Sequence, residues 1–335
     1  MTGDVMGSHF KIAAVIVTYN RKALLLECID ALLAQTRPPE AIFIIDNAST
    51  DGTGRLLHEN GLIGRTGDEA GARFKGGMAT MVRYVRLPEN AGGSGGFYEG
   101  VKLGYEAGYD WLWLMDDDAE PQYDALKILE EFLQENRQQD IAVLASKVVD
   151  KKGNVQACHR LLKTSRGGWS GCRHLRPNLI PDETYEEKSV EIGYASFVGF
   201  LANRKAIEKQ GLPNKDYFIL FDDTEYSVRL SKSGKIILVN GSIIVHKDDQ
   251  KAKQELSGLW RRYYGLRNQA FLARDHFNAG PVAIFFAIFL KAFIRIFRIS
   301  KFKRKESAIV IKAYMDFLKN RSGKILDPKS YRGEN

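Results

Sequence analysis

Residues 111–118, Trp-Leu-Trp-Leu-Met-Asp-Asp-Asp, decide the fold class of this chain. The unbroken apolar run at 111–115 is typical of a strand that is buried on both faces, as in parallel sheets covered by helices. Three aspartates follow at its carboxyl end, where ligands of open α/β sheets collect. Charges in that position are costly unless they are paired or bound to a metal ion. The stretch therefore predicts a buried strand with a functional edge.

Shorter apolar runs on the amino-terminal side alternate with amphipathic segments. Residues 12–17, 41–45 and 81–87 are expected to be strands, and amphipathic spacing predicts a helix after the first of them. This alternation is the pattern of βα units around a mostly parallel sheet. Residues 90–96 are rich in glycine and are expected to break regular structure before a helix over 97–107.

Alternation loosens after residue 150, where a loop-rich insertion is expected, and regular structure then returns. The expected later elements are a segment over 194–201, a helix from about Arg204, residues 217–221 leading into two aspartates, a helix over 224–232 and strands over 235–239 and 242–245. We expect three parts: residues 1–10 as a disordered terminus or a cloning remnant, 11–250 as an α/β catalytic domain, and 251–335 as a helical C-terminal region.

Composition narrows the class of protein. A chain of 335 residues with 44% hydrophobic content can bury a full core. The three cysteines, Cys28, Cys158 and Cys172, provide no disulfide framework and favour a reducing compartment. No secretory signal is readable at the N-terminus. The longest apolar run, 281–290, is about half of the ~20 residues that a spanning helix requires, so no transmembrane helix is expected.

The net charge of +8 is concentrated near the C-terminus. On a helix over about 281–300, Lys291, Arg295 and Arg298 would form one face, with Phe and Ile residues around the rest. This pattern is typical of a helix in the interface of an anionic membrane, and the alternative is a dimer or domain contact. Nucleic-acid binding is not expected, because the aromatic residues are not interleaved with a basic groove.

The triple aspartate has a specific chemical interpretation. On an extended backbone, side chains alternate, so Asp116 and Asp118 would point the same way. Two such carboxylates can share a hard divalent cation and leave positions for diphosphate oxygens. The alternative is a solvated turn that precedes a helix near Tyr123.

Two further motifs accompany the triple aspartate. Residues 15–21, Val-Ile-Val-Thr-Tyr-Asn-Arg, end the first expected strand, and residues 44–52, Ile-Ile-Asp-Asn-Ala-Ser-Thr-Asp-Gly, end the second. Together the three motifs resemble the GT-A fold of family 2 glycosyltransferases from about Lys11 to His246. The order Gly-Gly-Ser-Gly-Gly-Phe at 92–97, followed by 111–119, is most similar to bacterial galactofuranosyltransferases and the related rhamnosyltransferases.

The resemblance implies roles for residues at each motif. Thr18 and Tyr19 would hold the nucleoside, and Asp46 would accept a hydrogen bond from the base or ribose, with an Asx-turn as its alternative role. The other residues implied on the donor side are Arg21, Asn90, Gly93 and Asp117. The metal ligands would be Asp116, Asp118 and His246, holding Mn²⁺ or Mg²⁺. The sugar and acceptor side would be lined by Phe197, Gly199 and Trp169.

An inverting transfer also needs a carboxylate that removes the acceptor's proton. Asp223 is the expected base, with Asp222 as the alternate and Glu225 as a weaker third. These acids could instead favour a helix amino terminus. The cysteines and histidines at Cys158, His159, Cys172 and His174 could form a zinc site, although their spacing fits no common pattern.

The resemblance therefore implies an inverting, metal-dependent glycosyltransferase that moves galactofuranose from UDP-galactofuranose to a lipid-linked or polysaccharide acceptor. It would act in the cytoplasm, peripherally on the inner face of the plasma membrane, and a homo-oligomer is compatible with the sequence. A donor of dTDP-rhamnose is the nearest alternative. A nucleotidyltransferase would need a phosphate loop after the first strand, which Thr18 to Arg21 does not supply. A non-catalytic membrane scaffold would bind neither metal nor nucleotide.

Overall fold

The computed structural model describes residues 9–64, 71–75, 78–162, 179–247, 258–277, 279–299 and 304–328. Its strands are β1 (Ile12–Thr18), β2 (Ala41–Asp46), β3 (Gly71–Lys75), β4 (Met78–Arg86), β5 (Trp111–Asp116), β6 (Ala119–Pro121), β7 (Ile141–Val149), β8 (Arg160–Leu161), β9 (Ser189–Ile192), β10 (Tyr194–Ala195), β11 (Phe200–Asn203) and β12 (Lys235–His246).

The α-helices are α1 (Lys22–Leu33), α2 (Thr53–Glu59), α3 (Gly92–Glu106), α4 (Ala125–Glu135), α6 (Arg204–Gln210), α7 (Asp222–Leu230), α9 (Leu259–Phe277), α10 (Pro281–Ile284), α11 (Leu290–Ile299) and α12 (Arg304–Leu318). Short 3₁₀ turns occur at η1 (Ala157–His159), η2 (Asp182–Glu186) and η3 (Lys215–Tyr217). A π-helical segment, η4 (Phe285–Phe289), joins α10 to α11.

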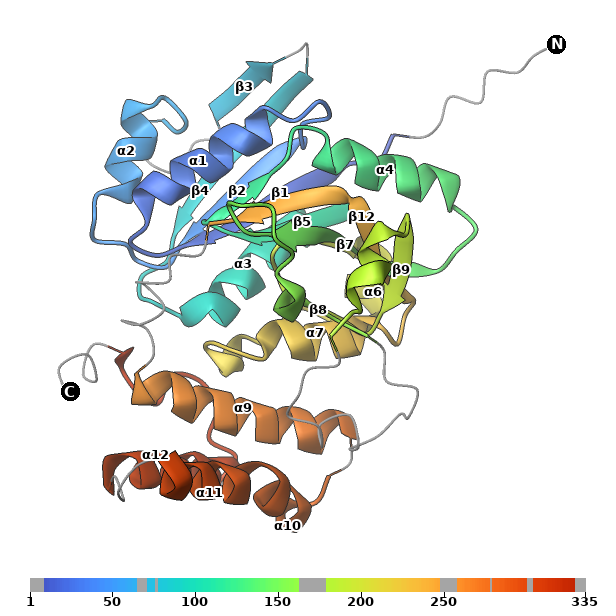
Figure 1. Ribbon diagram of the computed structural model, residues 1–335. Coiled ribbons are helices and arrows are strands. Elements are labelled where there is room, and N and C mark those ends of the chain that lie inside the picture. Colours follow the sequence, from blue (N-terminus) through green and yellow to red (C-terminus); the bar gives the residue numbers. More distant parts are fainter. Residues whose placement is uncertain are drawn as a thin grey trace.

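One large mixed sheet forms the centre of the molecule, in the order β3-β4-β2-β1-β5-β11-β7-β12-β6. Strands β4, β2, β1 and β5 are parallel, and β11 runs antiparallel between β5 and β7. Helices α1 and α4 cover one face of the sheet, and α3, α6 and α7 cover the other (Figure 1). Apolar side chains on both sheet faces are fully buried. This arrangement confirms the expected α/β class with a mostly parallel central sheet.

The glycine-rich segment differs from the prediction. It does not interrupt regular structure, because α3 begins at Gly92. Three glycines of α3, the last of the segment and two beyond it, recur every fourth residue and face the sheet. A Cβ added at Gly96, Gly100 or Gly104 would lie 2.5, 2.3 and 2.4 Å from side chains of β1 or β5. The glycines therefore allow the helix to pack close to the strands. The prediction of a break did not consider this packing role.

Three other expectations also need correction. The strands expected over 235–239 and 242–245 form one strand, β12, with a register shift between Val239 and Ile243. Residues 217–221 do not extend into a strand, because Phe218, Leu220 and Phe221 have positive φ. The strand expected to begin at 81 begins earlier, at Met78, and pairs with the unexpected strand β3.

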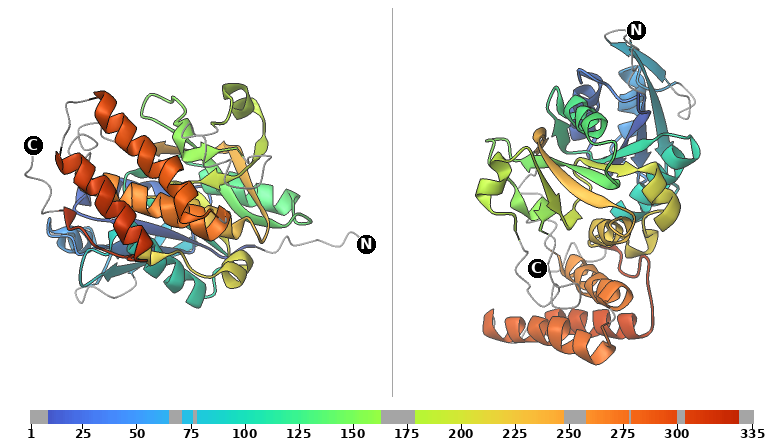
Figure 2. Two further views of the ribbon diagram at one scale, coloured as in Figure 1. Left: turned by 90° about the horizontal axis from the view of Figure 1, so that it is seen from below. Right: turned by 90° about the vertical axis from the view of Figure 1, so that its right-hand side faces the viewer.

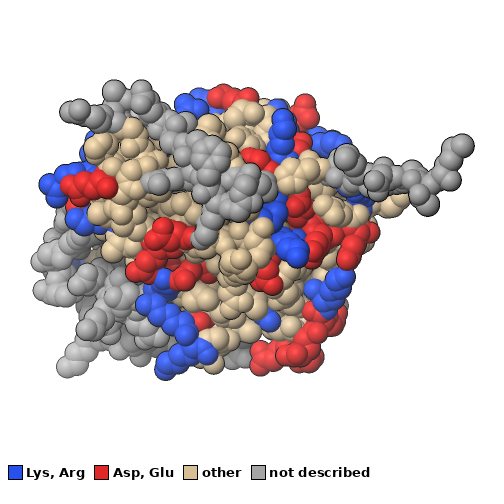
Figure 3. Space-filling view, turned by 90° about the horizontal axis from the view of Figure 1, so that it is seen from above, with Lys and Arg blue, Asp and Glu red and all other residues tan. Residues whose placement is uncertain are grey.

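The C-terminal helices form a separate layer below the sheet domain. Helix α9 lies between that domain and the layer of α10, α11 and α12 (Figure 2, right). Its aromatic side chains form a third apolar cluster, which also includes Tyr217 and Phe218 of the sheet domain. None of the helices in the described ranges is long and apolar enough to cross a membrane. On the face that carries α1 and α4, basic and acidic side chains are interspersed (Figure 3).

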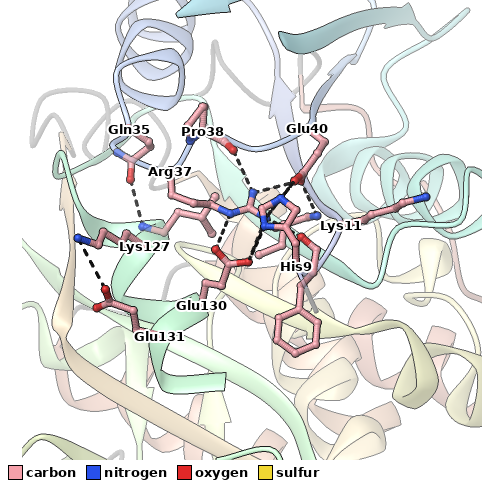
Figure 4. A network of polar contacts seen from close by, with 12 residues as sticks. His9, Lys11, Gln35, Arg37, Pro38, Glu40, Lys127, Glu130 and Glu131 are labelled. Atoms are coloured by element: carbon pink, nitrogen blue, oxygen red, sulfur yellow. Dashed lines mark hydrogen bonds and ion pairs between the residues drawn. The ribbon is translucent and has the colours of Figure 1, made fainter. Parts of the chain in front are cut away.

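A buried ionic cluster joins the amino-terminal ends of β1 and β2 to helix α4. Arg37 Nε donates to Glu130 Oε2 of α4 at 2.9 Å, and its other nitrogens donate to Glu40 at 3.0 and 3.1 Å (Figure 4). Glu40 Oε2 also accepts from the backbone N–H of Ile12 at 2.7 Å. This cluster lies at the opposite end of β1 and β2 from the aspartate-bearing edge, so it contributes to stability at a distance from the candidate site.

Candidate active site

Strand pairing brings the three motifs together at one edge of the sheet. Thr18 pairs with Asp46 across β1 and β2, and Val17 pairs with Asp116 across β1 and β5. These strands are parallel, so their carboxyl ends lie at the same edge. Thr18, Asp46 and Asp116, which belong to three separate sequence motifs, therefore lie at one edge of the sheet.

The three aspartates differ in their surroundings. The strand ends at Asp116, and Asp117 and Asp118 lie in a tight turn, so the extended alternation assumed from the sequence stops at the first aspartate. Thr18 Oγ1 donates to Asp117 Oδ2 at 2.7 Å. Arg21 Nη1 donates to Asp118 Oδ2 at 2.7 Å and to Asp117 Oδ1 at 3.3 Å. In this arrangement Arg21, expected on the donor side, is paired with the turn.

Burial and neighbouring charges shift the pKa values of the three aspartates. Burial, together with the charges of Asp118 and Asp117, raises the pKa of Asp116 to about 8. Burial likewise raises the pKa of Asp117 to about 6, although Arg21 opposes the shift. Burial would also raise the pKa of Asp118, but contacts with His246 and Arg21 outweigh it and hold that pKa below the usual value. Perturbed pKa values in one cluster of acids are typical of a functional site.

His246, the last residue of β12, lies beside the same turn. It ends β12 and pairs with Ala119 of β6, which follows the aspartates directly. Its Nε2 lies 3.3 Å from Asp118 Oδ1, an oxygen that is buried without a hydrogen-bond partner. Its Nδ1 lies 2.9 Å from Gln156 Oε1. An amide oxygen only accepts, so Nδ1 donates to Gln156, and Nε2 is the ring nitrogen that faces Asp118.

This donor set suits a divalent cation. An imidazole nitrogen facing a carboxylate oxygen that accepts no hydrogen bond, with a second carboxylate at Asp116, is a combination that suits Mn²⁺ or Mg²⁺. Across the described ranges, however, no three His, Cys, Asp or Glu side chains already converge closely enough to hold a metal ion. Asp116 would have to turn toward the Asp118–His246 pair.

Sequence reasoning missed the residues that orient His246. Gln156 Oε1 also lies 3.0 Å from His159 Nε2, and His159 Nδ1 lies 2.7 Å from Ser196 Oγ. The two imidazole rings meet edge to face, with centroids 4.9 Å apart. His159 thus belongs to a hydrogen-bonded chain leading to His246. The proposed zinc set stays a prediction, since Cys172 and His174 lie outside the described residues.

The amino terminus of α3 borders the same edge. Asn90 Oδ1 accepts from the N–H of Gly92 at 2.8 Å, which starts the helix. Gly93 has open space where a side chain would be, whereas Gly92 is pressed against Phe218 O. The buried hydroxyl of Ser94 faces Asp222 and partly opposes the rise in the pKa of that carboxyl. A helix amino terminus with open space beside it can accept an anionic ligand.

The Asp46 side chain accepts from the backbone three residues on, a local turn contact close to the Asx-turn expected as its alternative role. Its side chain is buried, Oδ1 accepts from the N–H of Ser49 at 2.8 Å, and Oδ2 accepts from Tyr84 Oη at 2.6 Å. It therefore organises the loop after β2, and its contact with a nucleoside stays a prediction. Tyr19, in contrast, is partly exposed.

The two candidate bases begin α7. Asp223 Oδ2 accepts from Tyr194 Oη at 2.9 Å, and Oδ1 accepts from the N–H of Thr224 at 2.6 Å. Burial raises the pKa of Asp223 in spite of these bonds. Burial and the charge of Asp223 raise the pKa of Asp222 to about 7. Glu225 is engaged elsewhere, because both of its oxygens accept from Arg229.

Two of the three expected sugar-lining residues lie in the packed core. Phe197 is buried and packs against Phe97, with ring centroids 4.5 Å apart, so its ring belongs to the core instead of a sugar-binding surface. Gly199 has a φ of +72°, and a Cβ there would lie 2.7 Å from Ile244, so packing explains this glycine. Trp169 lies outside the described residues.

Comparisons with known proteins identify the family of this chain. The family model described as glycosyl transferase family 2 matches residues 13–211, more than half of the chain. Galactofuranosyltransferase GlfT1 of Mycolicibacterium smegmatis is 28% identical over 226 residues, which make up 67% of this chain and 66% of that protein. GlfT1 of Mycobacterium tuberculosis is 31% identical over 222 residues, or 66% of this chain and 64% of that protein. The match spans slightly less than two thirds of these relatives.

Solved structures share the GT-A fold. The crystal structure of S. aureus TarS 1-349 has a TM-score of 0.55 and 16% sequence identity, and the match covers 92% of this chain and 80% of that one. TarS 1-349 is also solved in complex with UDP and with UDP-GlcNAc. GalNAc-T7 with UDP, GalNAc and Mn²⁺ has a TM-score of 0.53 and 16% identity over 72% of this chain and 44% of that one.

Proposed function

Because this chain belongs to glycosyl transferase family 2, we propose that it transfers galactofuranose from UDP-galactofuranose to a glycan acceptor with inversion at the anomeric carbon. The observation that carries the proposal is the turn at Asp116 to Asp118, which lies at the shared edge of β1 and β5 and faces His246. The similarity to two galactofuranosyltransferases supports the choice of sugar.

A divalent metal is part of the proposal. Asp116, Asp118 and His246 would hold Mn²⁺ or Mg²⁺, which would neutralise the diphosphate as it leaves. Asp118 supplies an oxygen that accepts no hydrogen bond, and Arg21 balances the remaining charge of the turn. Thr18 and Tyr19 would border the nucleoside, while Asn90 and Gly93 would border the diphosphate at the amino terminus of α3.

The base would be Asp223. Hydrogen bonds from Tyr194 and Thr224 stabilise its charged form, whereas Asp222, with a pKa of about 7, holds the proton of the pair more readily. Asp223 would accept the proton of the acceptor hydroxyl while the oxygen of that hydroxyl bonds to the anomeric carbon. The bond from that carbon to the diphosphate breaks in the same displacement, and UDP departs.

We further propose that the acceptor is lipid-linked and that the C-terminal helices rest on an anionic membrane. Two rows of exposed apolar side chains support this: Val282, Phe286 and Ile294 on α10 to α11, and Ile311, Met315 and Leu318 on α12. Lys291 is exposed beside the first row. The side chains of Arg295 and Arg298 lie outside the described residues. A protein of this kind would work at the inner face of the plasma membrane.

Vesicle flotation tests the membrane contact. We expect the protein to float with anionic vesicles, and Phe286→Ser to weaken flotation, because it removes an apolar side chain that is 59% exposed. Tyr123→Ser is the matched control, since Tyr123 is 66% exposed on the sheet domain. Equal flotation of both variants would contradict the proposed surface.

Ligand-dependent stability tests the catalytic proposal. With Mn²⁺ present, UDP should raise the melting temperature, because a ligand that binds only the folded state stabilises it. Asp118→Asn should remove that shift, whereas Asp124→Asn, which alters an exposed acid just beyond the turn, should retain it. A shift with dTDP but not with UDP would favour a rhamnosyltransferase. No shift with any nucleotide would favour a non-catalytic scaffold.

A further inference from the structure

Residues 216–221, here called the base loop, have an unusual backbone just before the candidate bases. Phe218, Leu220 and Phe221 all have φ between +64° and +68°, a region that side chains other than glycine rarely adopt. Such a backbone persists only when its surroundings determine it. Because α7 begins at Asp222, the path of the base loop fixes where the two candidate bases lie.

The contacts that determine this backbone come from α9. Asn268 Nδ2 lies 2.9 Å from each of three base-loop carbonyl oxygens, those of Tyr217, Ile219 and Leu220. Asn268 is fully buried, and its other side-chain atom, Oδ1, accepts from Arg267 Nε at 3.0 Å. The amide orientation is therefore set, with both hydrogens directed at the loop.

Arg267 adds to the same attachment. It is also fully buried, and its Nη2 donates to the carbonyl oxygens of Asp216 and Tyr217, each at 3.3 Å. Its Nη1 donates to the carbonyl oxygen of Gly323 at 2.8 Å. A buried guanidinium that faces backbone carbonyls orders a loop, because leaving those carbonyls unpaired would be costly.

The C-terminal end of α9 contacts α7, the helix that begins with the two candidate bases. His276 Nε2 lies 3.0 Å from Glu225 Oε1, and that oxygen also accepts from Arg229 Nε at 2.6 Å. Glu225 and Arg229 both belong to α7. Helix α9 thus contacts the chain on both sides of Asp222 and Asp223.

We propose that Asn268, oriented by Arg267, is a positioning residue for catalysis: it holds the base loop in the backbone that places Asp222 and Asp223. This inference rests on the proposed role of those aspartates as the base. It gives the C-terminal helix a part in the transfer step, although α9 lies outside the matched family region of residues 13–211.

The test compares Asn268→Ala with Tyr263→Phe in the full chain. Tyr263 is the control, because it is a buried residue of α9 whose hydroxyl donates to Asp316 Oδ2 of α12 at 2.7 Å, and Phe keeps the ring that lies 5.5 Å from the Arg267 guanidinium. Asn268→Ala should lower kcat by roughly tenfold to a hundredfold, as expected for a misplaced catalytic group. It should leave UDP affinity with Mn²⁺ unchanged, and Tyr263→Phe should retain the native kcat.

Amide hydrogen exchange supplies a readout that does not depend on turnover. In Asn268→Ala the peptide covering residues 216–225 should exchange faster, while the peptide covering 111–118 keeps its native rate. If Asn268→Ala fails to fold, Arg267→Lys carries the same expectations, because an ammonium cannot hold the Asn268 amide in the fixed geometry of a guanidinium.

The possible results separate this proposal from the proposed function. Native kcat or native exchange at 216–225 in a folded Asn268→Ala variant would overturn the positioning role. If Asp223→Asn is inactive at the same time, the proposed base still stands. If Asp222→Asn and Asp223→Asn both transfer sugar at the native rate, the proposed base is wrong, and the positioning role is overturned with it.

Discussion

At the scale of single residues, the hydrogen bonds of Asp223 lead to a prediction about pH. Asp223→Asn should lower turnover by about 10²- to 10⁴-fold, the contribution typical of a general base. In the native protein, burial raises the pKa of Asp223, so turnover should fall as the pH drops through that raised value and the carboxylate takes up a proton.

Tyr194→Phe tests the same assignment without removing the carboxylate. Tyr194 Oη donates to Asp223 Oδ2, and this bond stabilises the charged form. Its loss should raise the pKa of Asp223 further and move the acidic limb of the pH–rate profile to higher pH. An unmoved limb in this variant would show that another group controls it.

Gln156 leads to a second prediction at this scale. Its Oε1 accepts from His246 Nδ1, so Nε2 is the ring nitrogen on the side of Asp118 and of the proposed metal. Gln156→Leu should weaken Mn²⁺ binding by about 10- to 100-fold, the usual effect of losing such an orienting partner. Gln156→Glu keeps an accepting oxygen and should recover most of the affinity. Mn²⁺ titration followed by electron paramagnetic resonance measures both variants, and equal loss in both would contradict the orienting role.

Some of the site was predictable from sequence, and the rest depended on contacts between distant segments. The functional edge at Asp116 to Asp118 follows from one local pattern, since charges at the end of a buried strand are costly unless they are paired or bound. Gln156 has no such pattern, because its contact with His246 spans 90 residues. Asn268 lies in the C-terminal region that is expected to be helical, but only the fold shows that it reaches the base loop. Phe197 is buried against Phe97, and the sequence does not distinguish an aromatic residue beside a site from one in the core.

At the scale of elements, α3 shows how one helix combines packing with a binding role. Gly96, Gly100 and Gly104 face the sheet, whereas Gly93 faces open space. The sequence pattern of clustered glycines could not distinguish these roles, because both use the absence of a side chain. The difference depends on which side of the helix meets β1 and β5.

Substitutions in α3 should separate the two roles. Gly100→Ala would place a Cβ 2.3 Å from Val15 Cγ1, so we expect it to lower the free energy of unfolding by about 1 to 3 kcal/mol. Gly93→Ala meets no atom within 4 Å and should leave stability at or slightly above the native value. It should instead weaken UDP binding, because the new methyl group occupies space beside the helix amino terminus. Chemical denaturation and nucleotide titration check the pair.

At the scale of the whole molecule, stabilising and functional groups occupy opposite ends of the parallel strands. The Arg37 cluster joins the starts of β1 and β2 to α4, while the aspartates and His246 lie where strands end. The C-terminal layer adds a third region, attached through α9 to the base loop. These separations allow stability, chemistry and surface binding to be altered one at a time.

Arg37→Ala tests this separation. It leaves the carboxylate of Glu130 buried without its main partner, so the free energy of unfolding should fall by about 3 to 5 kcal/mol. Well below the melting temperature, the variant should still bind Mn²⁺ and UDP with native affinity, because β1 and β2 keep their pairing up to Thr18 and Asp46. Arg55→Ala is the control, since its ion pair with Glu59 is exposed and should contribute about 0 to 1 kcal/mol. A folded Arg37→Ala variant that has lost Mn²⁺ affinity would show that the two ends of the sheet are coupled, since metal binding would then depend on the cluster at the starts of the strands.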